Sequence, residues 1–180
     1  MQSRTNQERI KKVTLLGILL AFTLIMGLVE RMIPLDGMMP GMRLGLANLA
    51  IVISLYAFPP RDTIILVVLK CLMTAFFSGS IIALFYSMTG SIASLLIMLL
   101  LLKVKKVSII GVSVAGAAFH NIGQIVVARL IFGTWGILIY LPLLLIVGTV
   151  SGVVIGILAK LIRPRVIIYF KSTLRYERKE

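Results

Sequence analysis

A short run of polar residues lies inside an apolar segment of this chain, at Ala118-Phe119-His120-Asn121-Ile122-Gly123-Gln124. His120 and Gln124 are four residues apart, so a helix places them on one face with Asn121 beside them, and Arg129 follows near the end of the segment. Imidazole and amide groups both donate and accept hydrogen bonds. In hydrocarbon such groups usually face a bundle interior or a wet cavity. The run therefore predicts either a ligand site or a hydrogen-bonded clasp between helices.

The composition predicts an all-α integral membrane protein. The chain has 180 residues, of which 59% are hydrophobic, and its mean hydropathy is +1.08. Apolar runs of about 18 or more residues recur along most of its length, and runs of that length are typical of membrane-spanning helices. The first of them has no small-residue cleavage site, so we expect it to be retained as a helix rather than removed as a signal peptide.

Six candidate spans follow from the positions of the apolar runs and of the prolines and glycines between them. They cover approximately residues 13–33, 44–58, 63–77, 81–102, 107–132 and 137–162. The predicted organisation is a basic N-terminus (1–12), a six-helix membrane domain (13–163) and a basic tail (164–180). The second span is short for a full crossing, and the second and third spans together are also compatible with a re-entrant hairpin.

The distribution of basic residues predicts the orientation. The chain carries 19 Lys and Arg against 6 Asp and Glu. With both termini in the cytoplasm, the inner side holds most of these cations, in the two terminal segments, at Arg61 and in Lys103-Val104-Lys105-Lys106. This bias favours an even number of crossings. The net charge then reflects topology and contact with anionic lipid rather than binding to nucleic acid.

This orientation places the intramembrane polar residues at mid-depth or in the outer half. Arg43 and Asn48 lie at the outer end of the second span, Lys70 halfway along the third, and Tyr86 in the outer half of the fourth. Together with Arg129 and the polar run, they predict an outward-opening pocket with a cationic excess, suited to a carboxylate or phosphate ligand. The alternatives are a snorkelling Lys70 and an Arg129 that only anchors the end of its helix.

Catalysis by this chain has little support in the sequence. Its two aspartates, Asp36 and Asp62, are far apart, whereas a prenyl-transferring synthase needs clustered carboxylates for magnesium and diphosphate. The chain has no Walker A loop and neither a CxxC nor an HExxH metal pattern. We therefore expect no bound metal or cofactor and no ATP hydrolysis by this chain.

Two stretches carry a resemblance to a known family. Met42-Arg43-Leu44-Gly45-Leu46-Ala47-Asn48-Leu49 and the run from Ala118 to Gln124 resemble the signature stretches of the Gx transporter family, also described as heptaprenyl diphosphate synthase component I. That family is similar to the S components of energy-coupling factor (ECF) transporters. The resemblance implies a six-helix fold with an outward-facing pocket, and a coupling subunit and two ATPases as partners that hydrolyse ATP. It also implies docking of the coupling subunit at Gly17 and Ala21, where position 17 more commonly holds alanine.

The primary functional prediction is a substrate-binding subunit of an ECF-type importer in the bacterial plasma membrane. Its ligand would be a small, anionic molecule such as an isoprenoid, quinone or vitamin precursor. The predicted ligand-binding residues are Arg43, Asn48, Lys70, Tyr86, His120, Asn121, Gln124 and Arg129. One alternative is a non-catalytic accessory subunit of a heptaprenyl diphosphate synthase, in which the inner basic surface matters and the outer pocket does not. A stand-alone channel or carrier is a third.

Overall fold

Six α-helices and one short 3-10 helix make up the described part of the chain, residues 2–32, 45–104 and 106–174 of a computed structural model. The predicted all-α class is therefore confirmed. The predicted site residue Arg43 lies outside these ranges. The elements are α1 (Gln2–Met32), α2 (Asn48–Ala57), α3 (Pro60–Ser78), α4 (Ile81–Leu102), α5 (Ile109–Phe132), η1 (Trp135–Tyr140) and α6 (Leu141–Leu174).

Local signals set most of the helix ends. Pro60 is the first residue of α3, where a missing N–H costs nothing, and Gly79 ends that helix with a left-handed φ of +61°. The next two helices begin at serine caps: Ser80 Oγ accepts from the backbone N–H of Ala83, and Ser108 Oγ from that of Gly111. Because these signals are local, the predicted bounds of the fourth span coincide with α4.

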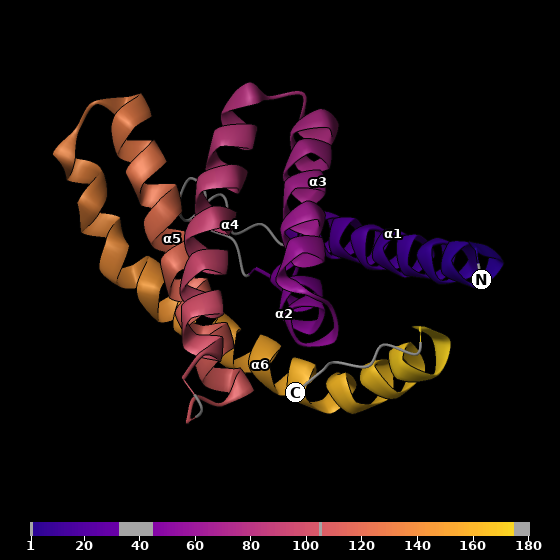
Figure 1. The fold of residues 1–180 in the computed structure, drawn as a ribbon. Helices are drawn as coiled ribbons and strands as arrows, with labels where there is room; N and C mark the ends of the chain where they lie inside the picture. The colour runs from indigo at the N-terminus through magenta and orange to yellow at the C-terminus, as the bar shows by residue number, and fades with distance from the viewer. Residues whose placement is uncertain (1, 33–44, 105, 175–180) are drawn as a thin grey trace.

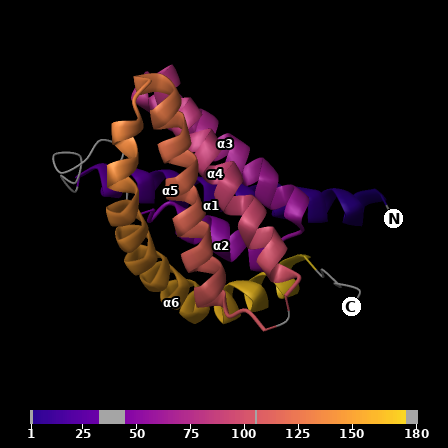
Figure 2. The ribbon, with the colours of Figure 1, turned by 90° about the vertical axis from the view of Figure 1, so that its left-hand side faces the viewer.

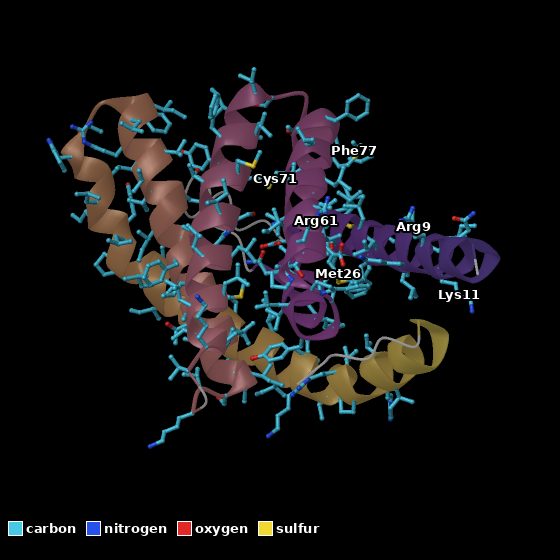
Figure 3. The ribbon with its side chains drawn as sticks, viewed as in Figure 1. Arg9, Lys11, Met26, Arg61, Cys71 and Phe77 are labelled. Carbon is cyan, nitrogen blue, oxygen red and sulfur yellow. The ribbon has the colours of Figure 1, made fainter. Side chains whose placement is uncertain are left out.

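Three helices stand side by side in chain order, α3, α4 and α5, and α6 runs along α5 before it curves beneath α2 (Figure 1). By contrast, α1 crosses these helices at a steep angle, and its N-terminal end projects from the rest of the molecule in both views (Figure 2). Cys71 lies between α3 and α4, whereas Phe77 projects from the far end of α3 (Figure 3). The Ser87 hydroxyl donates to Cys71 Sγ at 3.4 Å and joins the same two helices.

In the described part of the chain, four segments are long and apolar enough to cross a membrane, on the basis of length and composition. They are Arg9–Glu30, Ile81–Leu102, Ile109–Phe132 and Trp135–Val166. The protein is therefore a multi-pass membrane protein. α3 has 19 residues but carries three charged side chains, Arg61, Asp62 and Lys70. A six-helix membrane bundle with both termini in the cytoplasm stays a prediction.

The second predicted span differs from the structure. Helix α2 has 10 residues, which rise about 15 Å at about 1.5 Å per residue, whereas the hydrocarbon core is about 30 Å thick. Its residues from Asn48 to Leu55 are all buried, and it packs against α1, α3 and α6. An apolar run is equally compatible with lipid contact and with burial in protein. Here the run forms part of the protein core, and as a helix it is too short for a complete crossing.

The terminal helices extend through both predicted domain boundaries. α1 begins at Gln2, before the expected start of the membrane domain, and α6 continues past Pro164 to Leu174. Pro164 has no N–H for the helical ladder, and proline is a common cause of a helix bend. The part of α6 around and beyond this residue curves away from α5 (Figure 1). The basic tail therefore begins as a continuation of α6.

An ion pair joins α1 to α3. Lys12 Nζ lies 2.7 Å from Asp62 Oδ2, and the Asp62 side chain is buried. We expect Lys12→Met to lower the free energy of unfolding by about 1–3 kcal/mol, because it leaves a buried carboxylate without its cation. Thermal unfolding in detergent measures the effect. The matched control is Lys11→Met, which removes the exposed neighbouring lysine (Figure 3). An equal loss in both variants would contradict the role of the pair.

Candidate functional site

A buried polar cluster lies between α2, α3 and α4. Lys70 of α3 is only 6% exposed, and its Nζ donates to Asn48 Oδ1 and to Ser91 Oγ, each at 3.3 Å. An ammonium group in a protein interior needs such partners, because burial without them costs several kcal/mol. Lys70 therefore points into the helix assembly, and this geometry excludes the snorkelling alternative. The structure brings the predicted site residues Asn48 and Lys70 together.

Ser91 is part of this cluster, and the sequence interpretation missed it. Ser87, Ser91 and Ser94 all lie on α4 and are all buried. Their spacing of four and then three residues places them on one helix face. That spacing was the available signal. Three small hydroxyl residues aligned in an apolar helix indicate a polar contact with a neighbouring helix.

Glu30 at the end of α1 holds the start of α2 in place. Its Oε1 accepts a hydrogen bond from the backbone N–H of Gly45, and Gly45 has a left-handed φ of +77°. The turn after Gly45 leads into Asn48, whose backbone N–H donates to Gly45 O at 2.8 Å. This connection fixes the position from which Asn48 reaches Lys70.

His120 occupies a space that a glycine leaves open. The histidine is 7% exposed, and a Cβ added to Gly90 of α4 would lie 2.9 Å from both Cε1 and Nδ1 of its ring. On α5, Gly123 faces the same part of α4, where an added Cβ would lie 2.7 Å from the backbone oxygen of Thr89. Two glycines therefore permit the close approach of α4 and α5 that encloses His120.

Asn121 makes the kind of contact that the clasp interpretation requires. Its Nδ2 donates to the backbone oxygen of Leu144 in α6 at 2.6 Å, and the side chain is buried. Gly148 lies beside this bond, since an added Cβ there would lie 2.5 Å from Asn121 Nδ2. For this residue, the structure shows an α5–α6 hydrogen bond.

Two other predicted site residues line a cavity of about 390 Å³. Gln124 of α5 and Tyr86 of α4 form part of its wall, and η1 and the start of α6 complete it with residues that include Tyr140 and Leu144. A volume of this size falls within the range of about 300–1,000 Å³ of small-molecule sites. Leu144 links the cavity to the Asn121 contact, because its side chain is buried at the wall while its carbonyl accepts that bond.

Arg129 lies apart from both groups. Its guanidinium carbon sits 4.3 Å from the centroid of the Trp135 ring, a cation–π contact that joins the end of α5 to η1. Arg129 is not among the residues that line the cavity. The observed contact matches the alternative in which Arg129 anchors its helix. The two predicted cations that the structure describes therefore do not converge: Lys70 is in the polar cluster and Arg129 is against Trp135.

The predicted docking residues on α1 are exposed. A Cβ added to Gly17 would meet no atom within 4 Å, and Ala21 is likewise exposed. Gly17 also lines a groove of about 460 Å³ between α1 and α3, with Arg9 at one end. Packing within the described chain therefore does not account for the glycine at position 17, and the docking role stays a prediction.

Acidic and metal-ligating side chains are scattered. Within residues 2–32, 45–104 and 106–174, no group of three or more His, Cys, Asp or Glu is placed to hold a metal ion. Glu30 contacts Gly45 and Asp62 pairs with Lys12, in different parts of the fold. The described carboxylates thus show no arrangement suited to a magnesium–diphosphate complex.

Comparison with known families shows a match, over residues 19–162, to the profile described as heptaprenyl diphosphate synthase component I. The matched region includes α2 to α5, the C-terminal part of α1 and most of α6. Searches of curated proteins and of solved structures found no match.

Proposed function

Because this chain belongs to the heptaprenyl diphosphate synthase component I family, we propose that it is a non-catalytic membrane subunit that works with a separate synthase subunit. The family match over residues 19–162 carries the proposal. The four long apolar helices support a role in the membrane, and the scattered carboxylates support a partner that supplies the catalytic groups. We place the protein in a bacterial plasma membrane with both termini inside, on the basis of the basic-residue bias.

The surface through which it would meet a soluble partner is basic. Lys103 and Lys106 follow α4, and Lys160 and Arg165 belong to α6; all four side chains are exposed. The end of α4 and this part of α6 lie at the same end of the molecule (Figures 1 and 2). Exposed lysines and arginines of this kind attract acidic partner surfaces and anionic lipid headgroups.

Affinity purification from gently solubilised native membranes tests the proposal. We expect mass spectrometry of the purified complex to find a soluble, aspartate-rich prenyl diphosphate synthase. The Lys103→Glu/Lys106→Glu variant should recover clearly less of it, because the basic surface then repels an acidic partner. The matched control is Lys103→Arg/Lys106→Arg, which changes the same two exposed side chains and keeps the positive charge of the surface. Failure to recover any prenyl synthase would argue against the proposal.

A second candidate is the substrate-binding subunit of an ECF-type importer, with ATP hydrolysed by partner subunits. The buried cluster of Lys70, Asn48 and Ser91 favours it. Polar side chains buried inside a membrane protein often mark a ligand site. The exposed Gly17 and Ala21 would then contact the coupling subunit. Recovery of a coupling subunit with two ATPases in the same purification would support this candidate over the synthase partner.

A further inference from the structure

The cavity between α4, α5, η1 and α6 has a mostly apolar wall. Ile125, Ala128, Phe132 and Ile137 provide much of the surface, and Gln124 provides a buried amide. A wall of this kind binds the apolar body of a ligand, while a few polar groups fix its orientation. The cavity is distinct from the cluster around Lys70, since neither Lys70 nor Asn48 lines it.

Gln124 identifies the polar contact that such a ligand would make. Its side chain is 4% exposed, and Oε1 accepts no hydrogen bond from any residue that the structure describes. A buried carbonyl oxygen without a donor costs about 1–3 kcal/mol, so a native fold retains one where something else supplies the donor. A hydroxyl or N–H group on a ligand supplies that donor.

The charges around the cavity define the ligand further. Among the residues that the structure describes, no lining residue is charged. The predicted cations Lys70 and Arg129 are not part of the wall: Lys70 donates to Asn48 and Ser91, and the Arg129 guanidinium lies over the Trp135 ring, with its Nε buried and without a hydrogen-bond partner. An anion would lose its hydration here without gaining a cationic partner, which is strongly unfavourable. The cavity therefore suits an uncharged molecule.

We propose that this cavity binds a neutral, mostly apolar molecule whose hydroxyl or N–H group donates a hydrogen bond to Gln124 Oε1. The site goes beyond the proposed function, and it differs in ligand class from the anionic ligand expected from the sequence. It does not depend on which protein partner is found. Loss of the synthase interaction and loss of the cavity site are separately observable, because the basic surface and the cavity share no residue.

Two probes with the same apolar ring system test the hydrogen bond in the unmodified protein. Menthol has an apolar body and a hydroxyl donor, and menthyl methyl ether has the same body without the donor. Fluorescence emission from Trp135 reports binding in proteoliposomes, because neither probe absorbs at its wavelengths. Trp135 is the only tryptophan of the chain, and it is next to the cavity residue Gly136. We expect saturable binding of menthol that is roughly tenfold tighter than that of the ether, equivalent to about 1.4 kcal/mol. Equal responses to both probes, or no saturable response, would overturn the proposal.

Variants then assign the acceptor. Gln124→Leu keeps the approximate size of the side chain and removes the amide, so menthol should bind no more tightly than the ether. Ser87→Ala removes a hydroxyl from α4 outside the cavity wall and should keep the tenfold preference. A preference that survives Gln124→Leu or disappears in Ser87→Ala would overturn the assignment to Gln124. If Gln124→Leu does not fold, the comparison of the two probes in the wild-type protein still decides whether the site exists.

Discussion

Gly152→Ala is expected to lower the thermal stability of the protein clearly. A Cβ at this position of α6 would lie 2.7 Å from the Cα of Val114 and 3.2 Å from the backbone oxygen of Ser113, both in α5. These are backbone atoms, so the two helices must separate. Overpacking of this kind costs about 1–3 kcal/mol. The measurement is the midpoint of thermal unfolding in detergent, determined from the loss of monodisperse protein as the temperature rises.

The matched control for this variant is Gly17→Ala, which makes the same chemical change on α1. No atom lies within 4 Å of the added Cβ, and alanine has the higher helix propensity. We expect unchanged or slightly increased stability. Equal destabilisation by both substitutions would show that a general effect of alanine, rather than the α5–α6 contact, determines the result. Added Cβ atoms at Gly148 and Gly156 would also lie 2.5 Å and 2.7 Å from atoms of α5, so the three glycines form one packing face of α6.

Lys70→Met is expected to destabilise the fold through the groups that it leaves behind. Methionine has a similar length but no donor, so Asn48 Oδ1 and Ser91 Oγ lose their ammonium partner inside the protein. Each buried polar group without its partner costs about 1–3 kcal/mol. The unfolding midpoint should fall, whereas Lys103→Met, which changes an exposed lysine at the end of α4, should leave it unchanged.

A triple variant separates a ligand site from a structural clasp. Lys70→Met/Asn48→Leu/Ser91→Ala replaces the three side chains that these two hydrogen bonds join with apolar residues, and replacement of bonded partners together is often nearly neutral for stability. We expect stability to recover relative to Lys70→Met. The triple variant is then expressed in cells that lack the natural copy of the protein. If it is stable but does not restore the function that these cells have lost, the cluster has a functional role. Full activity of a stable triple variant would instead identify the cluster as a structural clasp.

Local sequence was sufficient for the helices that have clear end signals. α4 has the predicted bounds and α5 ends at the predicted Phe132, because the Ser80 cap at the start of α4 and the left-handed Gly133 after α5 act on their own neighbourhood. α2 was predicted too long. An apolar run carries no mark of whether lipid or protein covers it, and only the packing of α1, α3 and α6 around α2 shows that protein does.

The sequence predicted only part of the candidate site, because local signals identify polar residues but not the residues that they contact. The sequence identified Asn48, Lys70 and Gln124 as costly polar groups in an apolar setting, a property of each residue alone. The partners of Lys70, Asn48 and Ser91, lie 22 and 21 residues from it along the chain. The serine spacing on α4 signals a polar contact, but it does not identify the residue that makes the contact.

The sequence by itself therefore determined the membrane class, the all-α fold, the family and most of the polar residues that matter. Only the tertiary structure decided which polar residues meet. It directed Lys70 to Asn48 and Ser91, Arg129 to Trp135 and Gln124 to an uncharged cavity. The physical reason is that helix formation depends on neighbours within a few residues, whereas these contacts depend on how closely whole helices approach. Glycines such as Gly123 and Gly152 set that approach.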